Sequence, residues 1–185
     1  VSDADAEDSF CRLLSEGLTK KGNLLIEKSK SDVVPFIALE GKEWDSYVES
    51  LKESMQKNIR RRRKKLGAEF KARFVKTEDA SRLREDFQAF MTLHGKRSGT
   101  VGRRDKFSLK AYRLFHQRLA RKLVKQNRLH LSFLELNGER VASQYGFEYG
   151  GRLFAYQTGF DPKYKQWGVF QVLFGHIVEE CCGRG

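Results

Sequence analysis

The chain has 185 residues, of which 36 are lysine or arginine and 24 are aspartate or glutamate, so its formal net charge is +12. Apolar residues make up 39% of it and aromatic residues 12%, and no apolar run approaches the ~20 residues that cross a bilayer. These values exclude an intrinsically disordered chain and a membrane-spanning helix. They predict one globular domain, or one domain with a piece of another.

The cysteines and the N-terminus bear on the compartment. Cys11, Cys181 and Cys182 form an odd set with one adjacent pair, which suits neither a disulfide framework nor a metal-ligand spacing. The acidic first residues lack the basic start and apolar centre of a secretion signal. We therefore expect a cytoplasmic protein without a metal centre.

The first third of the chain predicts a boundary followed by a long helix. Residues 1–32 are expected to be the remnant of a preceding unit or a linker, with a short helix at 10–18 and a strand at 24–27. Residues 33–39 are expected to form a strand. A helix is then expected over 43–66, ended by Gly67.

Six consecutive basic residues, Arg60 to Lys65, end that helix and supply half of the net charge. One interpretation is a phosphate-binding patch for RNA, anionic lipid or a nucleotide cofactor. The other is the solvated face of a helix. The second is favoured because apolar residues at steps of three and four lead into the run and no aromatic residue interleaves it.

Two amphipathic helices are expected next, after a short strand at 70–75. Thr77, with two acidic residues behind it, is expected to cap the first helix. The buried stripe of this helix is expected to consist of Leu83, Phe87, Phe90, Met91 and His94. A basic, glycine-rich loop at 95–104 then leads to a helix at 107–126. The buried face predicted for that helix consists of Ala111, Tyr112, Leu114, Phe115, Leu119 and Leu123.

A three-stranded antiparallel meander is the strongest local prediction. Residues 129–136 and 139–149 flank Asn137-Gly138, a dipeptide that tolerates the positive φ angles of a type I′ turn. The alternation along 139–149 is typical of a half-buried strand. Gly150-Gly151 predicts a second tight turn into a strand at 152–158. A last helix is expected from about 168 to 182.

Residues 134–164 read LELNGERVASQYGFEYGGRLFAYQTGFDPKY, and residues 58–66 read NIRRRRKKL. The longer segment resembles the cellulose-biosynthesis (CelD-like) branch of the GNAT acyltransferase superfamily, a branch related to the Fem-type aminoacyltransferases. The shorter segment is similar to the same branch. The resemblance covers roughly residues 33–185. It implies an α/β fold of the α+β type, with a mixed, largely antiparallel sheet flanked by helices.

The resemblance also implies a site for acetyl-coenzyme A or another acyl-coenzyme A. The pantetheine is expected along the strand at 153–160, and the pyrophosphate on the loop before the last helix. The cofactor-binding residues that this implies are Gln157, Gly159, Phe160, Gln166, Trp167, Gly168, Val169, Phe170 and Gln171. The catalytic candidates are Tyr156 and Glu148. None of the four histidines is expected to act as the base. His94 and His116 lie in amphipathic helices and are expected to be packed or surface residues, and His130 and His176 have no carboxylate or cysteine at a spacing that makes a dyad or a metal site.

The chain departs from the family pattern in two places. A Ser-Pro-Gly-like step is replaced by Gly168-Val169-Phe170, which predicts either a shifted loop that uses Gly168 or a site that no longer binds coenzyme A. The sequence also stops where the family continues with another strand, so we expect residues 33–185 to be a C-terminally incomplete domain.

Three functions stay open at this point. The first is acyl transfer from acyl-coenzyme A to an amine or hydroxyl group of a sugar, lipid precursor or small metabolite. The second is Fem-like transfer from an aminoacyl-tRNA, with Arg60 to Lys65 contacting the RNA. The third is a non-catalytic binding or scaffold module.

Overall fold

The computed structural model describes residues 35–39, 41–100, 102 and 104–184. The helix expected at 10–18 and the strand expected at 24–27 lie outside these residues. Leu39–Gly185 form one compact unit. In chain order its helices, its strands and two short 3-10 helices (η) are α2 (Trp44–Glu49), α3 (Glu53–Glu69), β1 (Ala72–Lys76), α4 (Leu83–Thr100), η1 (Lys106–Ser108), α5 (Lys110–Val124), β2 (Leu129–Leu136), β3 (Glu139–Tyr149), β4 (Arg152–Phe160), η2 (Pro162–Trp167) and α6 (Val169–Cys182).

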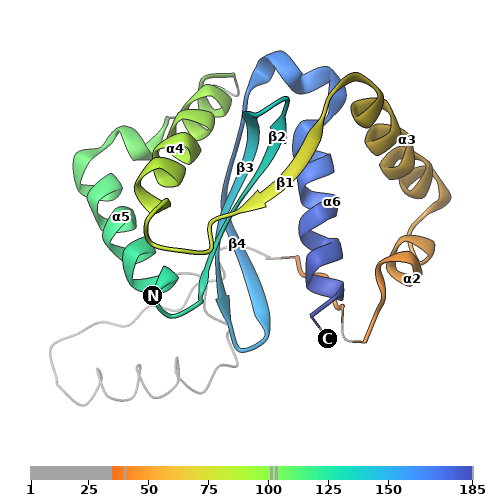
Figure 1. The fold of residues 1–185 in the computed structure, drawn as a ribbon, viewed down its shortest axis with the longest axis horizontal. Coiled ribbons are helices and arrows are strands. Elements are labelled where there is room, and N and C mark those ends of the chain that lie inside the picture. The colour runs from red at the N-terminus through yellow and green to blue at the C-terminus, as the bar shows by residue number, and fades with distance from the viewer. Residues whose placement is uncertain (1–34, 40, 101, 103, 185) are drawn as a thin grey trace, which may run out of the picture. The chain divides into compact units, whose positions relative to one another are not determined.

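The four strands form one antiparallel sheet in the order β1-β2-β3-β4 (Figure 1). Asn137 (φ 52°) and Gly138 (φ 85°) make the turn between β2 and β3, and Gly150 and Gly151 make the next one with φ of 57° and 70°. Two successive left-handed residues suit the twist of a two-residue hairpin. The predicted meander is therefore confirmed, and β1 extends it by one strand.

Helices cover both faces of the sheet: α4 and α5 lie on one side, and α6 with α3 beside it lies on the other (Figure 1). Each face has its own core, built around Phe90 and Tyr145 on the first side and around Leu134 and Leu173 on the second. Because β3 is buried from both sides at Val141–Gly146, the expectation of a half-buried strand is wrong. The residues that alternate with its large side chains, Ala142, Gln144 and Gly146, are small or polar, yet they are also buried, on the face that α6 covers.

The segment before the sheet differs from its prediction. Residues 35–39 are irregular instead of forming a strand. The helix expected over 43–66 is interrupted between Glu49 and Glu53, where the amide of Gln56 donates hydrogen bonds to the Glu49 and Leu51 carbonyls. These bonds satisfy carbonyls that the break would leave without partners. The second helix continues past Gly67 to Glu69, because Leu66 anchors its end in the core.

Helix α4 begins later than expected, at Leu83. Thr77 is buried and donates a hydrogen bond of 2.6 Å to Asp86, so it does not cap the helix. Asp79 instead closes the turn that leads into the helix, since its carboxylate accepts from the backbone N–H groups of Ser81 and Arg82. The helix also runs on to Thr100 through most of the expected loop. Its predicted buried stripe is confirmed at all five positions.

The predicted buried face of α5 is correct only in part. Tyr112 and Leu123 pack against the core, but the fully buried residues are His116, Ala120 and Val124, and Leu114 and Phe115 are 40% and 60% exposed. The residues of α5 that pack on the sheet recur every four positions and include His116. A prediction from apolar residues alone therefore put part of the buried face in the wrong place. No described helix is both long and apolar enough to span a membrane.

Candidate functional site

Strand β4 carries a β-bulge at Tyr156. Tyr145 of β3 pairs with Gln157, and the next residue, Gly146, pairs with Ala155, so Tyr156 is the extra residue. A Cβ on Gly146 would lie 2.4 Å from the Phe154 carbonyl oxygen, so only glycine permits the close approach of the two strands there. Among the described strands β4 is at the edge of the sheet. Backbone groups at the bulge are therefore not all used by the ladder.

Four polar aromatic side chains meet beside this bulge. The Tyr156 hydroxyl is 2.7 Å from the Tyr112 hydroxyl of α5, and Tyr156 is 41% exposed. The Tyr156 ring lies 5.2 Å from that of His116, whose Nδ1 is 3.2 Å from the Tyr145 hydroxyl. Burial lowers the pKa of His116, and burial together with the hydrogen bond to Tyr156 raises that of Tyr112. The His116 imidazole and the Tyr112 hydroxyl are therefore neutral near pH 7.

A second histidine ties the same strand to its neighbours. His94 of α4 is buried, with Nδ1 3.0 Å from Asp105 Oδ1 and Nε2 3.2 Å from Gln157 Oε1. Asp105 also accepts a hydrogen bond from the Phe107 N–H. The interpretation of His94 as a packed residue is confirmed, and its contacts fix Gln157 next to the bulge.

The N-terminus of α6 follows β4 and carries unused N–H groups. Gly168 begins the helix in a left-handed conformation (φ 63°, ψ 42°) without a side-chain cap, and the Val172 N–H is the first to donate back to its carbonyl. The N–H groups of residues 169–171 therefore have no acceptor within the helix. The Arg62 guanidinium of α3 packs against Gly168, where a Cβ would overlap it. A helix N-terminus and a cation at one point favour an anion.

The remaining predicted loop residues fall into two groups. Val169 is buried, Phe160 packs on the core beneath α6, and Trp167 packs edge-on against Phe70 at 5.2 Å. Gln166 and Gln171 are exposed. Phe170 lies in the first turn of α6, and its ring centroid is 6.3 Å from that of Phe174. The left-handed residue of the loop is Gly168, which is the residue that the shifted-loop alternative uses.

Comparison with known proteins identifies this arrangement of strands and helices. The sequence model of the acetyltransferase (GNAT) domain matches residues 53–185. The chain belongs to the GNAT acetyltransferase family. No curated protein matches the chain. The match begins at the first residue of α3, so Arg62 and every element from β1 to α6 belong to the GNAT domain. Membership of this family indicates acyl transfer.

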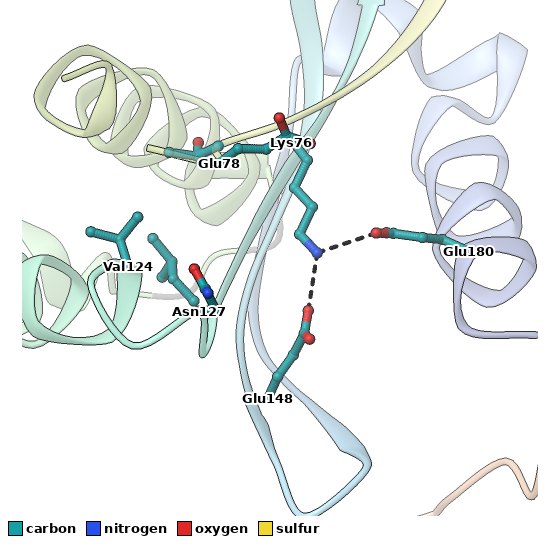
Figure 2. Close-up of a pocket in the computed structure, with 8 residues that line it drawn as sticks. Lys76, Glu78, Val124, Asn127, Glu148 and Glu180 are labelled. Carbon is teal, nitrogen blue, oxygen red and sulfur yellow. Dashed lines mark hydrogen bonds and ion pairs between the residues drawn. The ribbon is translucent and has the colours of Figure 1, made fainter. Parts of the chain in front are cut away.

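Glu148 of the GNAT domain lies in an ionic network with Lys76, which also contacts Glu180 of α6 (Figure 2). Its carboxylate is 3.2 Å from His130 Nδ1, 3.1 Å from Lys76 Nζ and 2.7 Å from Arg184, and Lys76 also reaches Glu180 at 3.2 Å. The network borders a cavity of about 170 Å³. The expectation that His130 and His176 have no carboxylate partner is wrong. The register of β2 and β3 brings Glu148 to His130, and His176 Nδ1 lies 3.4 Å from Glu179 one turn later in α6.

This network fixes the charge state of Glu148. The hydrogen bond with His130, together with those from Arg184 and Lys76, holds the pKa of Glu148 well below its usual range, although burial acts in the opposite direction. Such a carboxylate is a weak proton acceptor. Glu148 contacts the α6 side of the sheet, whereas Tyr156 contacts α5, so the two catalytic candidates lie on opposite faces.

The basic run of the GNAT domain is not a single patch. Arg63 pairs with Glu179 of α6 at 2.7 Å. It also stacks on Trp44 of α2, with its guanidinium carbon 4.6 Å from the ring centroid. Arg62 packs against Gly168. The other four side chains are exposed. Two of the six charges thus serve the contact between α3 and α6.

Sequence reasoning did not place Tyr112, His116 or Asp105 at the site. Tyr112 and His116 are four residues apart on α5, and this spacing was the available signal. Asp105 gave no local signal, because its partner His94 lies on another element. Arg62 belongs to the basic run that one interpretation assigned to phosphate binding, but nothing in the sequence separated it from its five neighbours. Within residues 35–39, 41–100, 102 and 104–184, no group of three or more His, Cys, Asp or Glu side chains is placed to hold a metal ion.

Proposed function

We propose that this GNAT domain, residues 33–185, transfers an acyl group from acetyl-coenzyme A or another acyl-coenzyme A to an amine or hydroxyl acceptor on a sugar, lipid precursor or small metabolite. The observation that carries the proposal is the bulged edge strand β4, which leads through the short helix η2 to the uncapped N-terminus of α6. We place the chain in the CelD-like branch on the residues at 134–164. Residues 1–32 are proposed to be a linker or part of a preceding unit, and the protein to be cytoplasmic.

The residues fit the co-substrate in two respects. The unused N–H groups of residues 169–171 and the Arg62 guanidinium suit a pyrophosphate, because both carry positive charge at one point. Strand β4 pairs with only one strand among the described residues, so its other edge offers backbone groups to the pantetheine amides, with Gln157 and Gly159 on the same strand. The bound co-substrate supplies the activated thioester.

Acyl transfer then needs the acceptor to lose one proton. The acceptor nitrogen or oxygen bonds to the carbonyl carbon, the carbon–sulfur bond breaks, and the thiolate leaves and takes up a proton. Tyr156 is proposed to relay this proton: its hydroxyl accepts the proton of the acceptor while it donates its own proton to the leaving thiolate, and the contact with Tyr112 holds it in place. Unused backbone N–H groups at the bulge are proposed to polarise the carbonyl. Glu148 is already neutralised by three partners, so the proposal does not rest on it.

Titration calorimetry with acetyl-coenzyme A tests the proposal. The wild-type protein is expected to bind, and Arg62→Gln to weaken binding about tenfold, since a charge-assisted hydrogen bond contributes roughly 1.5–3 kcal/mol. Lys64→Gln is the matched control, because Lys64 is exposed on the same helix. It is expected to bind like the wild type.

Each alternative function predicts a different result. Absence of binding heat and of any thermal shift would contradict the proposal and favour a non-catalytic module. Binding of aminoacyl-tRNA that weakens steeply with salt, without binding of acetyl-coenzyme A, would instead favour Fem-like transfer.

A further inference from the structure

The outward face of α5 is basic and also presents two large apolar side chains. Its exposed basic residues are Lys110, Arg118, Arg121, Lys122 and Lys125. Leu114 and Phe115 lie among them, 40% and 60% exposed. We refer to these seven residues as the α5 face. Leu114 and Phe115 are adjacent in the chain and rimmed by polar residues, and apolar patches of this kind mark sites of interaction with proteins or membranes.

Helical geometry places the α5 face away from the sheet. Tyr112, His116, Ala120 and Val124 follow one line at steps of four and pack inward. At 100° per residue, Leu114 and Arg118 lie about 160–200° from His116. The α5 face is therefore a separate surface from the bulge on β4, even though Tyr112 belongs to the same helix.

The positive charge of the α5 face is not compensated locally. Residues 106–128 contain eight Lys or Arg and no Asp or Glu. None of the five basic side chains of the α5 face forms an ion pair with the residues that the structure describes. Close like charges repel each other, so this surface favours an extended anionic partner.

We propose that the α5 face binds the surface of an anionic phospholipid membrane. Leu114 and Phe115 enter the boundary between headgroups and acyl chains, while Arg118, Lys122 and Lys125 contact lipid phosphates. Leu114 distinguishes this partner from RNA. An aliphatic side chain gains from contact with lipid chains, whereas an RNA-binding surface uses aromatic rings as stacking platforms, and the α5 face has one.

Vesicle co-sedimentation of the full chain tests this inference. The protein is expected to bind vesicles of phosphatidylcholine mixed with phosphatidylglycerol, not vesicles of phosphatidylcholine alone, and to be released by high salt. Arg118→Gln combined with Lys122→Gln is expected to lower the partition coefficient about 30-fold. Leu114→Ser combined with Phe115→Ser is expected to lower it about tenfold. Because both pairs are exposed, circular dichroism should show that the variants stay folded.

A matched control replaces two exposed basic residues on the other side of the sheet, Arg61→Gln with Lys64→Gln, and is expected to keep most of the binding. Full vesicle binding by the Leu114→Ser, Phe115→Ser variant would overturn the proposal. So would equal loss in the control variant, which would indicate a general charge effect. Binding of a mixed-sequence RNA without binding of anionic vesicles would also overturn it. The test does not depend on acyl transfer, so its failure leaves the proposed function standing.

Discussion

Gly159 of β4 lies so close to His94 of α4 that a Cβ on Gly159 would be 2.4 Å from the His94 backbone nitrogen. The obstruction is backbone, which cannot rotate away as a side-chain tip can. Glycine at this position therefore sets the distance between α4 and the strand that carries the proposed site.

Gly159→Ala is expected to lower the free energy of unfolding by about 2–4 kcal/mol, because α4 or β4 must shift to admit the methyl group. Urea denaturation measures the change. Gly99→Ala in α4 is the control, since a Cβ there meets nothing within 4 Å. This substitution is expected to stabilise the folded protein slightly. Equal denaturation midpoints for the two variants would show that the packing explanation is wrong.

Gly168→Ala is expected to destabilise the protein for two separable reasons. The residue has φ 63°, which costs alanine about 1 kcal/mol, and the new methyl group overlaps the Arg62 guanidinium. Adding Arg62→Ala should recover the second part and leave the first. The free energies of unfolding of the two single variants and the double variant measure this. A double variant no more stable than Gly168→Ala would contradict the contact with Arg62.

Glu148 should make stability depend on acid pH. Its pKa is lowered in the folded protein, so its contribution is complete above the unfolded pKa of about 4.3 and is lost as the pH falls toward the folded value. Glu148→Gln is expected to lower stability at pH 7 by about 1–3 kcal/mol and to flatten the fall below about pH 4.3.

Unfolding measured between neutral and acid pH tests the role of Glu148. Glu139→Gln serves as the control, because Glu139 pairs with Lys163 in an exposed position and should change stability much less. A Glu148→Gln protein with an unchanged acid slope would not be consistent with this account.

Tyr156→Phe tests the proposed proton carrier. The variant keeps the ring that packs on His116 and removes only the hydroxyl that meets Tyr112. We expect kcat to fall roughly 100-fold with little change in KM for acyl-coenzyme A, because the lost group acts in proton transfer. Tyr149→Phe is the control, since Tyr149 is 66% exposed at the far end of the hairpin. If Tyr156→Phe retained wild-type kcat, the hydroxyl would have no part in the reaction.

The sheet was predictable from the sequence because its determinants are local. The Asn137-Gly138 turn fixed the ends of β2 and β3, and those bounds agree with the structure. Helix starts were less predictable. Thr77 and Asp79 are both capping residue types, but Thr77 contacts Asp86 and Asp79 closes the turn before α4, so the helix begins later than either residue predicts.

The candidate site was predictable in place but not in its contacts. A resemblance in sequence located the strand and the loop, and the structure shows them in succession as β4 and α6. A bulge adds one residue to a strand and leaves no periodic signal, so Tyr156 gave no sign of it. The Tyr112–Tyr156 and Lys76–Glu148 contacts join residues 44 and 72 positions apart, which strand register and helix docking decide.

Phe133 and Leu134 are consecutive in β2, yet Phe133 packs beneath α4 and α5 while Leu134 packs beneath α6. Their side chains share no neighbours across the sheet. Truncating both should therefore cost close to the sum of the two single losses, whereas Leu134 and Leu173, far apart in the chain, should show strong energetic coupling. The energetic coupling between two substitutions in this protein should therefore depend on whether the residues share a face of the sheet, and not on how close they are in the sequence.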